Sequence, residues 1–295
     1  MGIDSRIAEL ADITEAIKCF DSEKDLHIIR SGQSSLLVNL QEIWAYRELL
    51  VLLAWRDIKV RYKQTYLGVA WAIIQPLFSM IVFSVIFGQL AKLPSEGVPY
   101  PIYTFAALLP WQLFSYSFNA SSNSLVGNER LIEKVYFPRL ILPLASVMAG
   151  VIDFLFGFLI YILLMFVFHV PITIRLLAIP LLLIFTVFTA LSIGIWMSAI
   201  NVKYRDVRYI VPFIIQIWMY ASPVAYSVTI IPDQWKWLYG LNPIVGVIEG
   251  FRWALLGIDT QGSNLILLSV LIVIVIFIFS INYFKKTEEI FVDVL

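Results

Sequence analysis

Residues 176–212 read LLAIPLLLIFTVFTALSIGIWMSAINVKYRDVRYIVP and join a long apolar segment to a compact group of charges. Residues 176–202 contain no Asp, Glu, Lys or Arg. The charges that follow lie within six positions: Lys203, Arg205, Asp206 and Arg208. A helix of roughly 18 or more apolar residues is long enough to cross the hydrocarbon core of a bilayer. The stretch therefore predicts a transmembrane helix that ends in a short charged loop.

The same pattern recurs along the whole chain. Of its 295 residues, 60% are hydrophobic and 14% are charged, whereas soluble domains have about 25% charged residues. Soluble core helices rarely run past about 20 residues without a charged face, so we interpret the chain as an all-α integral membrane protein. Its apolar segments predict six transmembrane helices, within a domain at 65–286, at about 66–90, 101–125, 140–168, 177–200, 209–227 and 263–284.

The basic residues predict the orientation of these helices. An even number of spans places both termini on the same side of the membrane. The segments on that side carry Arg56, Lys59, Arg61, Lys63, Arg130, Lys134, Arg139, Lys203, Arg205, Arg208, Lys285 and Lys286. The opposite side carries only Lys92, Arg175, Lys236 and Arg252. Because Lys and Arg in short loops stay cytoplasmic, we expect a cytoplasmic N-terminal tail at 1–40 and a cytoplasmic C-terminal tail at 287–295.

The segment before the first span predicts an amphipathic helix over residues 41–64. Trp44, Val51 and Trp55 lie on one stripe of a helix, and a cationic stripe lies beside it. Such a helix lies in the membrane interface, here on the cytoplasmic leaflet. Its cations either anchor the protein to anionic lipid or also bind the anionic headgroup of a substrate. The candidate headgroup residues are Arg56, Lys59, Arg61 and Lys63.

Residues 228–262 are apolar and aromatic but are interrupted by several prolines and glycines. The pattern predicts two short re-entrant helices that dip into the outer leaflet and return, since irregular backbone at that depth must lie against protein or water. A loop lying flat on the membrane is the alternative. Glu249 and Arg252 are three positions apart, so they can pair on one helix face.

The sequence lacks the usual patterns of catalytic and cofactor sites. It has no G-x-x-x-x-G-K-[ST] phosphate-binding loop. Its two histidines, His27 and His169, and its single cysteine, Cys19, do not have metal-ligand spacing. We therefore expect no enzyme activity, no metal and no cofactor in this chain, and nothing in its composition points to a nucleic-acid partner.

Asp153 is the acidic residue that lies well inside a predicted span. A charge at the bilayer centre costs about 2.5–3.5 kcal/mol on insertion scales, so this carboxyl group must meet protein or water. We favour a hydrogen bond between helices over a role in proton-coupled transport. Several aromatic residues within spans exceed what an interfacial belt needs and would suit a pore for a sugar chain, with ordinary helix packing as the alternative: Trp71, Phe78, Phe83, Trp218 and Tyr220.

Four segments in order carry a resemblance to a known family. They are WRDIKVRYKQTYLGVAWAIIQPL at 55–77, NERLIEKVYFPR at 128–139, NVKYRDVRYI at 201–210 and LNPIVGVIEGFRWALLG at 241–257. Over about residues 40–290 the chain resembles the membrane subunit of ABC transporters that export polysaccharides such as O-antigen, capsule and teichoic acid. The resemblance implies a homodimer in the bacterial inner membrane, joined to two ATPase subunits that bind ATP and Mg²⁺.

The same resemblance implies roles for individual residues. The two charged loops would contact the ATPase through Glu129, Arg130, Glu133, Lys134 and Arg139 first, and then through Lys203, Arg205, Asp206 and Arg208. The alternative is that these charges only set the topology. The substrate would be a lipid-linked glycan whose diphosphate meets the cations of residues 41–64, while Glu249 and Arg252 would lie at an outer gate.

Two other functions fit parts of the pattern. One is an ABC exporter subunit for a drug or a lipid, which differs only in its cargo. The other is a secondary carrier or membrane-embedded enzyme that acts alone, without ATP, and depends on Asp153. The absence of a catalytic cluster argues against the enzyme, and the clustered cytoplasmic charges argue against a chain that acts without a partner.

Overall fold

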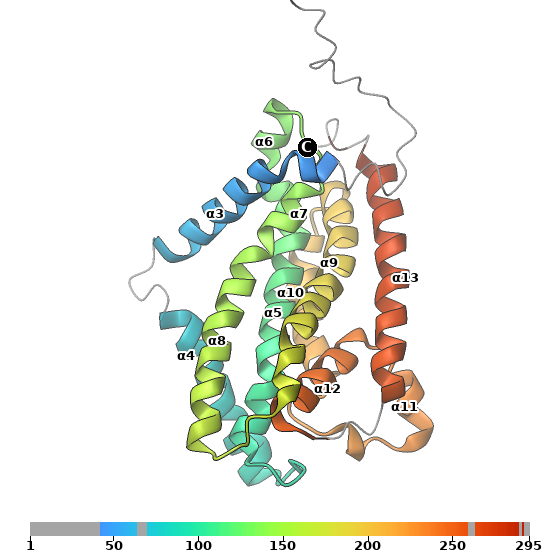
Figure 1. Ribbon diagram of the computed structural model, residues 1–295. Coiled ribbons are helices and arrows are strands. Elements are labelled where there is room, and N and C mark those ends of the chain that lie inside the picture. The colour runs from blue at the N-terminus through green and yellow to red at the C-terminus, as the bar shows by residue number, and fades with distance from the viewer. Residues whose placement is uncertain (1–41, 64–69, 259–262, 289–290, 292–295) are drawn as a thin grey trace, which may run out of the picture. The chain divides into compact units, whose positions relative to one another are not determined.

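The computed structural model describes residues 42–63, 70–258, 263–288 and 291, and every regular element within them is a helix (Figure 1). Four stretches are long and apolar enough to cross a membrane: Ala70–Leu90, Ile141–Val167, Ile174–Lys203 and Leu265–Glu288. They correspond to the first, third, fourth and sixth predicted spans. The described part of the chain is thus the expected all-α protein with several apolar spans.

The helices follow one another in a fixed order. They are α3 (Arg47–Lys63), α4 (Ala70–Phe83), the π-helix η1 (Ser84–Leu90), α5 (Tyr100–Gly127), α6 (Glu129–Lys134), α7 (Ile141–Ser146), α8 (Met148–Val167), the 3₁₀ helix η2 (Ile174–Ala178), α9 (Ile179–Lys203), α10 (Val207–Tyr220), the 3₁₀ turn η3 (Val228–Ile230), α11 (Asp233–Tyr239), α12 (Pro243–Leu256) and α13 (Ser263–Glu288). The predicted tail at 1–40, residues 289–290 and 292–295 of the predicted tail at 287–295, and the first residues of span one lie outside the described residues.

Helix α5 is the centre of the bundle. It packs against α4, α8, α9 and α12, and Phe105, Phe114 and Phe118 are fully buried along it. With 28 residues it is as long as the apolar spans, but its Ser, Asn and Gln side chains lower its hydropathy. Because neighbouring helices surround α5, most of these polar groups face protein and not lipid.

Helix α10 is shorter than the span predicted at 209–227. Its 14 residues extend only about 21 Å at 1.5 Å per residue, against a hydrocarbon thickness of about 30 Å. The helix ends before Pro223, which has no N–H to donate and disfavours helical backbone at Ser222. The apolar composition continues past this point, so hydropathy alone extended the predicted helix too far.

Helix α3 is partly buried against the bundle and partly exposed, with a turn at Tyr46 before its first residue. Leu53 and Ala54 are buried, and the helix packs on α7 and α8. Trp44, Val51 and Trp55, the predicted lipid-facing stripe, are exposed. The exposed stripe is therefore available to a membrane surface.

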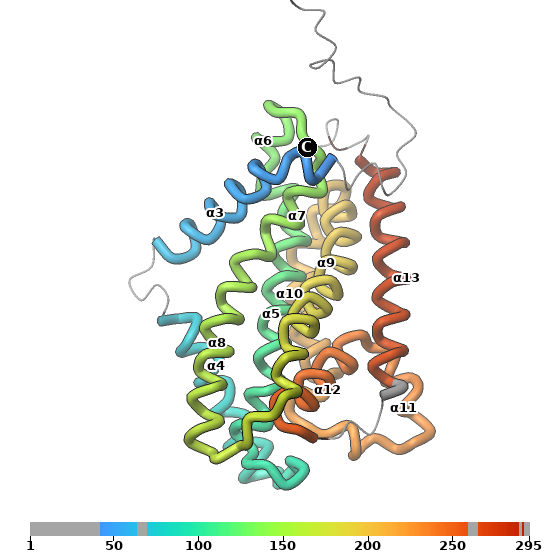
Figure 2. Tube along the Cα trace, viewed as in Figure 1, coloured from blue at the N-terminus to red at the C-terminus, as the bar shows by residue number. Residues whose placement is uncertain are grey.

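The two ends of the bundle differ in charge. Helix α6, the start of α3 and the end of α13 lie together at one end, at the top of Figures 1 and 2, and η2 and α11 lie at the other. The charged segments at 129–139, 203–208 and 285–286 therefore share one end. The structure thus brings together three of the charged segments that the topology prediction assigned to a single side.

The segment between α10 and α13 contains two short helices, as predicted. Asn242 caps α12 by accepting a 3.1 Å hydrogen bond from the Ile244 N–H, and Gly257 ends it at φ +71°, where glycine is favoured. Most side chains of α12 are buried, against α5, α9 and α13. Helix α12 is therefore part of the bundle and not a loop lying on its surface.

Candidate functional site

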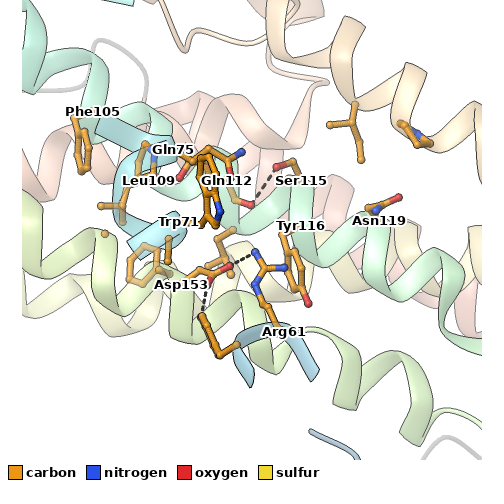
Figure 3. Close-up of a pocket in the computed structure, with 18 residues that line it drawn as sticks. Arg61, Trp71, Gln75, Phe105, Leu109, Gln112, Ser115, Tyr116, Asn119 and Asp153 are labelled. Carbon is orange, nitrogen blue, oxygen red and sulfur yellow. Dashed lines mark hydrogen bonds and ion pairs between the residues drawn. The ribbon is translucent and has the colours of Figure 1, made fainter. Parts of the chain in front are cut away.

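A cavity of about 540 Å³ opens among α3, α4, α5, α8 and α10 (Figure 3). This volume lies in the range of roughly 300–1,000 Å³ that is typical of ligand sites. Its wall combines an ion pair, side-chain amides, hydroxyl groups and aromatic rings. The polar and aromatic residues in it include Arg61, Tyr62, Trp71, Gln75, Gln112, Ser115, Tyr116, Asn119 and Asp153.

The ion pair connects α3 to α8. The Arg61 Nη2 donates to Asp153 Oδ2 at 2.5 Å, and the Tyr62 hydroxyl donates to Asp153 Oδ1. The Arg61 guanidinium also lies 4.2 Å from the ring centroid of Tyr116, within range of a cation–π interaction. Asp153 therefore forms hydrogen bonds between two helices, as we favoured from the sequence. Its partners Arg61 and Tyr62 lie about ninety positions earlier in the chain.

Two donors from α3 satisfy a carboxylate that would otherwise be costly inside the bundle. Burial raises the pKa of Tyr62 above its ordinary value of 10.0, and its hydrogen bond to Asp153 acts in the same direction. The Tyr62 phenol therefore keeps its proton at neutral pH and remains a donor to Asp153.

Helix α5 supplies a row of polar side chains to this cavity: Gln112, Ser115, Tyr116 and Asn119. Positions three, four and seven apart lie on one face of a helix, so the row follows from the spacing. Gln75 of α4 lines the same cavity. Sequence reasoning did not single out any of these residues, although polar side chains inside a charge-free span were the signal that marks them.

The four candidate headgroup cations do not share one environment. Only Arg61 lines the cavity. Arg56 pairs with the adjacent Asp57 at 2.8 Å, the Lys59 Nζ lies 5.4 Å from the ring centroid of Trp55, and Lys63 is exposed at the end of α3. The three cations outside the cavity remain candidates for an anionic headgroup at the membrane surface.

A second cavity, of about 370 Å³, joins the two charged loops. Its wall includes Glu129 at the start of α6, Arg205 between α9 and α10, and Arg208 in the first turn of α10. Asn201 also lines it and is 1% exposed; its Nδ2 donates to the Ser122 carbonyl at 2.9 Å. The Asn201 Oδ1 accepts no hydrogen bond from the part of the chain that the structure describes. The loops predicted to act together are therefore neighbours in space.

The other candidate coupling residues divide into two groups. Arg130, Glu133, Lys134, Lys203 and Asp206 are exposed at this end of the bundle. Arg139, in contrast, donates to the Glu288 carbonyl and lies 5.6 Å from the ring centroid of Phe291. Arg139 therefore holds the end of α13 and is less available to a partner than the rest of the set.

The candidate channel-lining aromatic residues also fall into two groups, those that are exposed or line the cavity and those that pack against other side chains. Trp71 lines the large cavity, and Phe78 and Tyr220 are exposed. Trp218 instead donates from Nε1 to Asn242 Oδ1 at 2.8 Å and packs edge-on against Phe114. Trp218 is thus a packing residue that links α10 to α12. Phe83 packs on Phe87, four residues further along the chain, with the two rings tilted by 38°.

The predicted pair of Glu249 and Arg252 forms, with 3.3 Å between Glu249 Oε1 and Arg252 Nη1. Arg252 is 2% exposed. It also donates to the carbonyls of Tyr226 at 3.2 Å and Val224 at 3.3 Å, and lies 4.0 Å from the ring centroid of Tyr103. Arg252 therefore anchors α12 to the segment after α10 and to α5.

Comparison with known proteins connects this arrangement to transport. Residues 48–256 match the family model described as "ABC-2 type transporter". An O-antigen export system permease protein RfbA of Klebsiella pneumoniae is 31% identical over 206 residues, which cover 70% of this chain and 79% of the relative. RfbA of Myxococcus xanthus is 27% identical, covering 72% and 82% respectively. The polysialic acid transport protein KpsM of Escherichia coli is 25% identical, covering 79% and 91%.

Proposed function

This chain belongs to the ABC-2 type transporter family, and from that premise we propose that it is the membrane subunit of an ATP-driven polysaccharide exporter. Its similarity to permeases named for O-antigen export and polysialic acid transport supports this cargo class. Two copies of the chain would form the channel, in the bacterial inner membrane. Two copies of a partner ATPase would bind ATP and Mg²⁺.

The observation that carries the proposal is the meeting of the two charged loops at one end of the bundle. Helix α6 exposes Glu133 and Lys134, and the 370 Å³ cavity beside it is bordered by Arg205 and Arg208. A polar surface with charges of both signs suits a partner interface that opens and closes, because its charges can pair without a large apolar area. This surface is where the ATPase would dock.

The membrane topology that we propose has six spans. The second and fifth spans would be α5 and α10, in addition to the four apolar stretches. Both termini would be cytoplasmic, at the end that carries α6, since Lys and Arg in short loops stay inside. Helices α11 and α12 would form the re-entrant outer segment, and Glu249 and Arg252 would stabilise the outer gate.

The substrate path would begin at α3. Arg56, Lys59 and Lys63 would hold the diphosphate of a lipid-linked glycan through charge-assisted hydrogen bonds. The glycan would then pass between the two copies, along surfaces that include the exposed Trp71 and Tyr220. Closure of the ATPase on ATP would move the charged loops and separate the facing spans.

Charge reversal of the α6 pair tests the proposal. The tagged chain is purified in mild detergent from its native membrane with whatever binds it. We expect an ATPase at one-to-one stoichiometry, and at least a fivefold loss of bound ATPase in the variant Glu133→Lys/Lys134→Glu. The matched control is Asp233→Lys/Lys236→Glu on α11, which reverses a 2.7 Å ion pair at the opposite end.

The control should retain the ATPase. A chain that purifies alone and transports in proteoliposomes without ATP would contradict the proposal and favour the secondary carrier that depends on Asp153.

A further inference from the structure

We propose that the 540 Å³ cavity between α3 and the spans binds neutral sugar rings of the transported glycan, through Asp153, Gln75 and Gln112. This inference rests on the proposed function and deepens it. It assigns a role to a cavity in the bundle that is separate from the candidate headgroup cations Arg56, Lys59 and Lys63. Four observations support it: charge balance, unused amides, an exposed aromatic face and position.

The charges of the cavity indicate a ligand without net charge. Among the described residues that line the cavity, Arg61 and Asp153 are the only ones with a charged side chain. They form an ion pair with each other. A diphosphate would require an excess of cations, since desolvating an anion without compensation is unfavourable. The cations Arg56, Lys59 and Lys63 do not line the cavity. A neutral, hydroxyl-rich ring matches this balance better than a phosphate group does.

The amides provide the hydrogen bonds that such a ring needs. Gln75 and Gln112 make no side-chain hydrogen bond to any residue that the structure describes. A primary amide both donates and accepts, as a sugar hydroxyl does. From the described part of the chain the Asp153 carboxylate receives two donors, whereas a carboxylate has about four lone-pair positions. Polar side chains inside a membrane domain are costly unless they are satisfied, so a polar occupant of this cavity is favoured.

Among the described aromatic residues of the cavity wall, Trp71 is exposed, whereas Tyr62 and Tyr116 are half-buried and Phe105 and Phe154 are buried. Trp71 is 53% exposed and lines the cavity beside Gln75. The Tyr116 ring is already covered by the Arg61 guanidinium, and Phe105 is buried against Tyr161. The C–H face of a pyranose ring packs on an indole ring while its hydroxyl groups bind polar groups at the rim. Trp71 and the two amides offer this combination.

The position of the cavity is consistent with a substrate that carries both a charged and a neutral part. Arg61 lies at the end of α3, two residues before Lys63. A lipid diphosphate held by Arg56, Lys59 and Lys63 would therefore place its first sugars next to the Arg61–Asp153 pair. The same helix would bind the two chemically different parts of one molecule.

Photo-crosslinking in cells that make the polysaccharide tests this inference. The full chain, with its ATPase, carries p-benzoylphenylalanine either at Ser115, in the cavity wall, or at Leu159, which is exposed elsewhere on α8. We expect a covalent adduct detected by an antibody against the glycan at Ser115, and at least tenfold less at Leu159. Equal adducts at the two positions, or none at Ser115 while export continues, would overturn the cavity as a sugar site.

Substitution of the amides provides the second measurement. Gln75→Leu/Gln112→Leu keeps side-chain size and removes the hydrogen bonds, so we expect at least a fivefold fall in both the Ser115 adduct and surface polysaccharide. The matched control is Gln89→Leu, which changes an exposed glutamine of η1 outside the cavity, and ATPase co-purification checks assembly. Unchanged export in an assembled double variant contradicts the inference alone. If deletion of the whole chain leaves surface polysaccharide unchanged, the proposed function fails as well.

Discussion

At the scale of single residues, the carboxylate of Asp153 is held by donors that lie about ninety positions away in the sequence. The charge-free surroundings of Asp153 predicted that it needs a partner, because an isolated ion inside a span is costly. They did not identify Arg61, which was assigned to the candidate headgroup-binding residues. No sequence pattern relates α3 to α8, so only packing of the two helices reveals the pair.

A variant that lacks Arg61 alone should therefore be less stable than a variant that lacks both charges of the pair. In Arg61→Ala the carboxylate loses its cation, and we expect the free energy of unfolding to fall by about 1–2 kcal/mol, since the pair is partly exposed. Arg61→Ala/Asp153→Asn should recover part of this loss, because no uncompensated charge remains. Thermal unfolding in one detergent at constant lipid content measures both. A double variant that is less stable than Arg61→Ala would contradict the assignment.

Arg252 should not tolerate replacement by lysine. Its planar guanidinium reaches Glu249 and the carbonyls of Val224 and Tyr226 together, and a single ammonium group cannot reproduce this geometry. We expect Arg252→Lys to lower the free energy of unfolding by about 2 kcal/mol, the usual value for losing hydrogen bonds to a charged group. Lys236→Arg, on a partly exposed surface pair, is the control and should change the melting temperature little. Equal shifts in both variants would argue against the anchoring role.

At the scale of elements, long uncharged runs predicted helices reliably, and interruptions within apolar sequence were harder to place. Helix α9 follows directly from residues 176–202, where hydropathy and length agree. The end of α10 was misplaced because residues 221–227 remain apolar while Pro223 stops the helix. The polar row of α5 was missed because it lies in a span that reads as a membrane helix, and only the neighbouring α4 and α8 show that it faces a cavity.

Close contact between α12 and α13 depends on Gly246. A Cβ at this position would lie 2.5 Å from the Ser269 Oγ and 3.2 Å from the Ile266 Cα. We expect Gly246→Ala to separate these helices and to destabilise by about 1–3 kcal/mol, the range for overpacking. Gly127→Ala, where nothing lies within 4 Å of the added Cβ, should be neutral or slightly stabilising. The melting temperatures of the two variants in detergent provide the comparison, and equal values would show that the helices adjust freely.

At the scale of the whole molecule, the described bundle exposes a face that lipid alone does not explain. Helix α10 exposes Tyr209, Phe213, Ile217 and Tyr220, and Gln216 is exposed between them. A polar amide that faces hydrocarbon is unfavourable, whereas a second copy of the chain or a polar path would satisfy it. Helix α10 also borders the 540 Å³ cavity through Pro212 and Ile215. The proposed dimer interface and the proposed sugar site are therefore adjacent.

Disulfide crosslinking tests whether this face meets a second copy. In a Cys19→Ser background, which removes the single natural cysteine, Phe213→Cys should give a covalent dimer on mild oxidation, because residues on the two-fold axis of a symmetric interface approach their own copies. Leu163→Cys on α8, exposed to a similar extent, should remain monomeric under the same oxidant. The products are separated by non-reducing electrophoresis from intact membranes. Dimers at both positions would indicate random collision, and dimers at Leu163→Cys alone would place the interface, and with it the channel, at α8 instead of α10.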